Sequence, residues 1–145
     1  MRRLLFFLII CIALVFFGKA DLASFNSKFD GEYVVYSTEK SDTKAFAVAG
    51  ITVFRADFIE QISGKNEVLG ETITLSGSKD DIPTILNRLY TVYHTSETIG
   101  DIYIVYGYSP KLKRTQFINR KPVNLQITYH NGTITISNPI NLGSF

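Results

Sequence analysis

A short polar turn between two alternating segments constrains the fold of this chain more than any other feature. The sequence YHNGTI, Tyr129–Ile134, places Asn131-Gly132 between residues that favour strands. Asn-Gly is the usual central pair of a two-residue hairpin turn, because both positions need a positive φ. Apolar and polar residues alternate over residues 123–127 before the turn, as a strand with one buried face requires. The C-terminal third is therefore predicted to form antiparallel sheet.

Further strands are indicated by runs of β-branched and aromatic residues at 31–38, 70–77 and 101–110. The segment 45–62 is compatible with two structures. Its apolar residues fit a helical stripe at steps of three and four, whereas Gly50 followed by β-branched residues favours a strand. We expect a strand over 44–55 and a second, short strand over 57–62.

The sequence SKDDIPTILNRLYTVY, residues 78–93, predicts a helix. Ser78 and Asp81 have the spacing of a capping box, and Pro83 falls near the first turn, where proline is tolerated. One apolar face suits a helix that lies on a sheet, and it consists of Ile82, Ile85, Leu86, Leu89 and Val92. Residues 94–101 are expected to form a loop.

Together these elements predict an α+β fold, a mostly antiparallel sheet with one or two helices packed on a face. At 145 residues the chain is long enough for one domain with a single core. We expect that domain to span residues 32–145, after a leader or linker at 21–31.

The first twenty residues have the order of an export signal. Arg2 and Arg3 precede an uncharged apolar run, Leu4–Phe17, and Gly18-Lys19-Ala20 offers a cleavage site. As a helix that run spans about 21 Å, less than the roughly 30 Å of a bilayer core. A cleaved signal peptide and a retained membrane anchor both remain open. Either predicts an extracytoplasmic protein, secreted or tethered to the outer face of the cytoplasmic membrane, with membrane contact only through this segment.

The chain contains a single cysteine, Cys11, which lies within the apolar run. Cleavage after Ala20 would leave a protein without disulfides or thiol chemistry. A small secreted eukaryotic domain often carries disulfides, so their absence favours a bacterial exported protein.

Charge is distributed unevenly along the chain. All 13 acidic residues precede residue 102, and the segment that follows contains only basic charges. Such asymmetry indicates an interaction surface, or two halves that pack with opposite charges together. The candidate binding residues are Tyr108, Lys111, Lys113, Arg114, Arg120 and Lys121.

Aromatic residues among these cations could bind an anionic envelope polymer, a phospholipid headgroup surface or an acidic protein partner. Nucleic acid is not expected, because the chain is predicted to be exported. The alternative is that Lys111, Lys113 and Arg114 form a solvated hairpin tip, kept basic to discourage pairing of strand edges.

No catalytic or metal-binding motif is evident. His94 and His130 are the only histidines, and we expect His94 to end the helix and His130 to precede the hairpin turn. Metal-ligand spacings, a nucleophile motif and a phosphate loop are all lacking in the sequence. We therefore expect no enzyme, cofactor or metal site.

Two other classes of function stay open. One is an envelope hydrolase with paired carboxylates, for which the candidates are Glu32, Glu39, Asp57, Glu60 and Glu71. The other is a structural assembly subunit that joins chains through exposed strand edges.

The C-terminal half resembles a known group. GDIYIVYGYSPKL at Gly100–Leu112, VNLQI at Val123–Ile127 and T-I-x-x-P-I-x-L-G-S-F at Thr135–Phe145 are similar to the small exported YwmB-like proteins of endospore-forming Firmicutes. The sequence GETITLSG at 70–77 and the helix after it fit the same order. The resemblance implies a sheet that carries helices, shaped like the TATA-box-binding protein, and a link to sporulation. It implies no catalytic residue.

Overall fold

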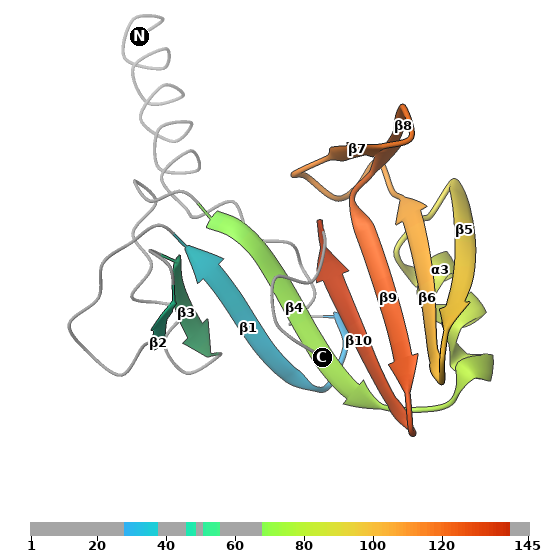
Figure 1. Ribbon diagram of the computed structural model, residues 1–145, viewed down its shortest axis with the longest axis horizontal. Helices are drawn as coiled ribbons and strands as arrows, with labels where there is room; N and C mark the ends of the chain where they lie inside the picture. Colours follow the sequence, from blue (N-terminus) through green and yellow to red (C-terminus); the bar gives the residue numbers. More distant parts are fainter. Residues whose placement is uncertain (1–27, 38–45, 49–50, 56–67, 140–145) are drawn as a thin grey trace, which may run out of the picture.

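The computed structural model describes residues 28–37, 46–48, 51–55 and 68–139 (Figure 1). Eight strands form one sheet in the order β2-β3-β1-β4-β10-β9-β6-β5, and β7 and β8 form a separate hairpin. Every pairing is antiparallel. The strands are β1 (Glu32–Ser37), β2 (Phe46–Val48), β3 (Ile51–Arg55), β4 (Val68–Ser76), β5 (Tyr93–Ile99), β6 (Ile102–Tyr108), β7 (Gln116–Ile118), β8 (Lys121–Val123), β9 (Leu125–His130) and β10 (Thr133–Asn138). A 3-10 turn, η2 (Lys79–Asp81), leads into the helix α3 (Ile82–Arg88).

The predicted class, a mostly antiparallel α+β fold, is confirmed by these elements. Within the described part of the chain the sheet carries one helix rather than two. The strand expected over 44–55 contains β2 and β3, which pair with each other as a hairpin. The short strand expected over 57–62 and the leader at residues 1–20 lie outside the described residues.

The hairpin predicted from Asn131-Gly132 is confirmed. Strand β9 ends at His130, the two turn residues have φ values of 47° and 79°, and β10 begins at Thr133. Both positive φ values are those of a type I′ turn, whose twist matches the strands on either side. Strand β10 ends at Asn138, directly before Pro139, whose missing N–H cannot extend the ladder.

The helix is shorter than expected. Its start is correct, because the Ser78 backbone N–H donates to the Asp81 carboxylate at 2.7 Å. It ends at Arg88, however, with Leu89 as its C-cap, since Tyr90 adopts a φ of 56° that no helix continues through. Val92 was expected on the apolar face of the helix and is instead 64% exposed.

The prediction of a loop over 94–101 was wrong. Most of this segment belongs to β5, the edge strand, which pairs with β6 along its whole length. All seven side chains of β5 are exposed, so the sequence contains no alternation that would mark a buried face. His94 therefore lies on a strand and not at the helix end.

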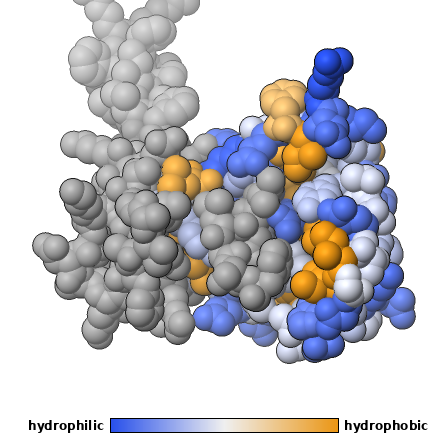
Figure 2. Space-filling view, in the orientation of Figure 1, coloured by the Kyte–Doolittle hydropathy of each residue, from blue (hydrophilic) through white to orange (hydrophobic). Residues whose placement is uncertain are grey.

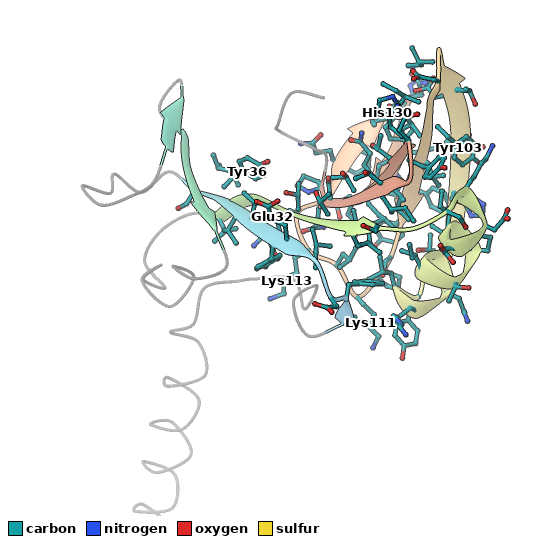
Figure 3. The ribbon with its side chains drawn as sticks, turned by 90° about the horizontal axis from the view of Figure 1, so that it is seen from below. Glu32, Tyr36, Tyr103, Lys111, Lys113 and His130 are labelled. Atoms are coloured by element: carbon teal, nitrogen blue, oxygen red, sulfur yellow. The ribbon has the colours of Figure 1, made fainter. Side chains whose placement is uncertain are left out.

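The core lies between α3 and one face of the sheet. The helix contributes Ile82, Ile85, Leu86 and Leu89, and the sheet contributes Tyr33, Val35, Ile73, Val105, Leu125, Ile127, Ile134 and Ile136. Because side chains alternate along a strand, the neighbouring residues point to the opposite face. That second face is largely polar and includes Thr72, Thr74, Gln126, Thr128, Thr135 and Ser137. Figure 3 shows Lys111 and Lys113 on the α3 side of the sheet and Tyr36 on the other side.

Candidate binding site at the basic end of the sheet

The segment that holds most of the predicted binding residues connects β6 to β9 and lies at one end of the sheet (Figure 1). We call this the basic end. Its first part is fixed against the core by Asn124, whose side-chain amide donates to the carbonyls of Ser109 at 2.7 Å and Leu112 at 2.8 Å. Leu112 is buried beside them. Ser109 and Leu112 are thus buried in the folded core, while Lys111 between them is exposed, and this part of the segment is not a hairpin tip.

Arg114 makes its contacts inside the protein. Its Nη1 lies 2.6 Å from Oε1 of Glu71 and 3.0 Å from Oδ1 of Asn138, and its Nε donates to the Val68 carbonyl at 2.8 Å. The side chain is only 14% exposed and that of Glu71 is fully buried. The prediction of Arg114 as a solvated residue of a hairpin tip was therefore wrong, and its guanidinium is already occupied by internal partners. The sequence could not reveal this pair, since 43 residues separate its members.

The same buried carboxylate accepts a hydrogen bond from the Tyr33 hydroxyl. Burial raises the pKa of Tyr33 above its usual value, and the negative charge of Glu71 adds to the effect. The tyrosine therefore stays protonated and donates to the glutamate. Asn138 completes the arrangement, because its amide donates to the carbonyls of Lys113 and Asn124 at 2.8 and 2.6 Å. This network fastens the loop to β1, β4 and β10.

The geometry also bears on the candidate hydrolase. Glu32 pairs with Thr74 on the polar face of the sheet, whereas Glu71 lies on the α3 side with Arg114. These two carboxylates point to opposite faces, so they cannot act on one bond. The other candidates, Glu39, Asp57 and Glu60, lie outside the described residues. In the described ranges no group of His, Cys, Asp and Glu could hold a metal ion.

The hairpin tip is elsewhere in the segment. Strands β7 and β8 pair from Gln116 to Val123, and the two-residue turn between them is Asn119-Arg120, with φ values of 50° and 64°. Arg120 and Lys121 are exposed there, and Phe117 on β7 is 74% exposed. Of the six predicted binding residues, Lys111, Lys113, Arg120 and Lys121 are exposed, and Tyr108 is half-buried in a ring stack with Tyr93 at 5.9 Å.

A cluster that the sequence did not indicate lies beside these residues, where α3 ends. The Tyr90 ring is 61% exposed and has two ammonium groups near it, Lys28 Nζ at 5.4 Å and Lys111 Nζ at 5.9 Å from its centroid. Arg88 donates to the Lys28 carbonyl at 2.8 Å. We call Lys28, Arg88, Tyr90 and Lys111 the Tyr90 cluster. Its members come from three separate segments, so no sequence window contains them.

The exposed aromatic and aliphatic residues at this end accompany the cations. Tyr90, Val92 and Phe117 are each more than 60% exposed. Figure 2 shows hydrophobic side chains next to strongly hydrophilic ones at the end of the molecule that carries β7 and β8. A surface of this composition can attract an anion and also contact an apolar or sugar face.

The two histidines lie apart from the basic end. His130 is 2.8 Å from the Asp101 carboxylate, and this hydrogen bond holds the pKa of Asp101 below its usual range. His94 lines an open groove of about 300 Å³ beside α3, together with Lys79, Asp80 and Tyr103. Lys79 Nζ lies 3.7 Å from the Tyr103 ring centroid.

Comparisons with known proteins give no family. No protein-family model matches the chain, and neither the curated proteins nor the solved structures contain a match. The resemblance to YwmB-like proteins thus stays a prediction. In the part of the chain that the structure describes, no helix is long and apolar enough to cross a membrane.

Proposed function

We propose that this protein is an exported, non-enzymatic binding domain of the cell envelope and that its ligand is an anionic envelope polymer. The Tyr90 cluster and the exposed hairpin tip at Arg120-Lys121 form the binding surface. The observation that carries the proposal is the Tyr90 ring, 61% exposed between two lysine ammonium groups.

The arrangement suits a ligand with repeated negative charges. Lys28 and Lys111 repel each other when both lie near one ring, and an anion between them relieves that repulsion. Arg88 is near the C-terminal end of α3, where the helix dipole accounts for part of its placement. The dipole does not account for Arg120 and Lys121, which lie on the β7–β8 hairpin. A polymer can contact both groups at once.

An acidic protein is the other partner predicted from the sequence. The two kinds of ligand predict different effects of chain length on binding affinity, because a longer flexible polymer contacts more cations. Titration with polyphosphates of increasing length distinguishes them: affinity rises with length for a polymer site and stays flat for a site shaped to one protein.

A single and a triple charge reversal test the site. Lys111→Glu should lower retention on washed envelopes at low salt about fivefold, since one exposed ion pair contributes up to about 1 kcal/mol. The triple variant Lys111→Glu/Arg120→Glu/Lys121→Glu should abolish retention. The matched control is Lys79→Glu, another lysine beside a tyrosine ring, at the opposite end of β6.

The control should be retained like the unmodified chain, and all variants should unfold within about 0.5 kcal/mol of it, as expected for exposed positions. An equal loss of retention in Lys79→Glu and Lys111→Glu would mean that retention depends on net charge and not on this site. Full retention of the triple variant would refute the proposal.

Export and sporulation are separate parts of the proposal. Export is supported by the order of residues 1–20, and it predicts that the protein fractionates outside the cytoplasm. A full-length product dissolved in the cytosol would contradict it. The link to sporulation is supported only by the resemblance over residues 70–145, and it predicts a lower spore yield when the gene is deleted.

A further inference from the structure

Strand β5 presents an open edge. It is the last strand of the sheet among the described residues and pairs with β6 through seven residue pairs, from Tyr93 with Tyr108 to Ile99 with Ile102. Figure 1 shows β5 at the margin of the sheet, and among the described strands only β6 pairs with it. Its outward backbone N–H and C=O groups are therefore available to another strand.

Edge strands usually carry features that prevent such pairing. Lysine, proline, a β-bulge or a very short strand each blocks the approach of another chain. Strand β5, with the sequence YHTSETI, has none of these, and its register with β6 is continuous. Glu97 is its one acidic or basic residue apart from His94. The edge is long and regular enough for pairing.

The order of side chains on β5 is complementary to itself. Tyr93, Thr95, Glu97 and Ile99 share the face of Tyr108, Tyr106, Ile104 and Ile102, and the intervening residues point to the α3 side. An antiparallel pairing of two copies centred on Ser96 places Tyr93 of one copy opposite Ile99 of the other. The same register places Thr95 opposite Glu97 and His94 opposite Thr98.

This register covers both exposed apolar side chains of the strand, since Tyr93 is 36% and Ile99 is 58% exposed in the single chain. The two Glu97 carboxylates lie diagonally and not opposite each other. Each one also has a partner within its own chain, because the hydrogen bond and charge of Glu97 contribute to the raised pKa of Tyr106. Binding of a peptide from another protein would not require the two ends of β5 to be complementary, so this complementarity favours a second copy of the chain.

We propose that two copies of this chain associate through β5, antiparallel and centred on Ser96, so that their sheets become one continuous sheet. Tyr93, at the start of this surface, donates its hydroxyl to the Pro122 carbonyl of the β7–β8 hairpin, and the rest of β5 runs away from the basic end. The proposed pairing does not depend on the proposed ligand. A symmetric pair would present two basic ends to one polymer, which raises the overall avidity.

Cysteine pairing tests the register. The cysteine variants are made in a chain that carries Cys11→Ser, which removes the only native cysteine. Residues directly opposite in an antiparallel pair have Cα atoms about 4.5–5.5 Å apart, within the range of a disulfide. Ser96→Cys should therefore give a disulfide-linked dimer under mild oxidation of the full chain as isolated from cells.

The neighbouring positions supply matched controls. Thr98→Cys alone should form little dimer, because its two copies are displaced by four residues, about 13 Å. His94→Cys alone should behave in the same way. A mixture of the His94→Cys and Thr98→Cys chains should form the mixed dimer, because this register places those two residues opposite each other.

Light scattering supplies a second measurement that requires no oxidation. The mass should approach that of two chains as concentration rises, and Ile99→Lys should shift this transition at least tenfold upward in concentration. Ile99 is exposed, so that variant should keep its thermal stability. The proposal would be overturned if Ser96→Cys and Thr98→Cys cross-linked equally. It would also be overturned by a chain that stays monomeric at every concentration, whether or not that monomer binds a strand of another protein.

Discussion

Arg114 reaches from the loop after β6 to the wholly buried carboxylate of Glu71. Arg114→Met should destabilise the fold by about 3–5 kcal/mol, because it leaves that charge buried without its partner. Urea denaturation measures the change. Arg120→Met removes an exposed arginine of the same segment and should change stability by less than about 0.5 kcal/mol. The double variant Glu71→Gln/Arg114→Met should recover part of the loss, and a double variant as unstable as Arg114→Met would contradict this account.

Tyr33 predicts how stability depends on alkaline pH. Burial raises the pKa of its hydroxyl in the folded state, whereas in the unfolded chain it titrates near 10. The contribution of this hydroxyl to the free energy of unfolding is fully present below pH 10. It is lost as the pH rises from there toward the folded-state pKa, because in that range only the unfolded state releases the proton. Stability between pH 10 and 11.5 should therefore fall more steeply in the unmodified chain than in Tyr33→Phe. Equal slopes in denaturation curves would show that this hydroxyl does not couple to folding.

At the scale of elements, the two turns of the C-terminal half offer a matched pair of tests. Gly132 has a φ of 79° with open space where a Cβ would lie, so Gly132→Ala should lose about 1–2 kcal/mol through backbone strain alone. Arg120 holds a φ of 64° in the other turn without being glycine. Arg120→Gly should therefore be neutral or stabilise the hairpin slightly. Thermal unfolding of both variants checks the signs, and a stabilising Gly132→Ala would rule out the turn geometry.

The elements also show what the sequence could predict. Asn131-Gly132 and the alternation around it identified β9 and β10, since turn chemistry and a half-buried strand both act within a few residues. Strand β5 was missed because its seven side chains are all exposed, and an edge strand of this kind has no period to detect. The helix stops before Tyr90, which has a positive φ, and no glycine or proline at this point of the sequence indicates the stop. Among the residues predicted from charge, Lys111, Arg120 and Lys121 are exposed, whereas Arg114 is paired internally with Glu71 on β4, a contact that the sequence does not indicate.

At the scale of the whole molecule, the charge asymmetry of the sequence is partly internal and partly a surface property. Arg114 meets an acid of the first half of the chain, while Lys111, Arg120 and Lys121 stay exposed at the basic end. Binding through those cations should weaken as salt rises, because screening shortens the reach of exposed charges to about 8 Å at 0.15 M ionic strength. Affinity for polyphosphate, measured between about 0.05 and 0.3 M salt, should fall steeply for the unmodified chain and for Lys79→Glu. The slope should be shallower for Arg120→Glu/Lys121→Glu, since fewer ion pairs remain to be screened. Parallel slopes for all three chains would place the polyanion elsewhere on the molecule.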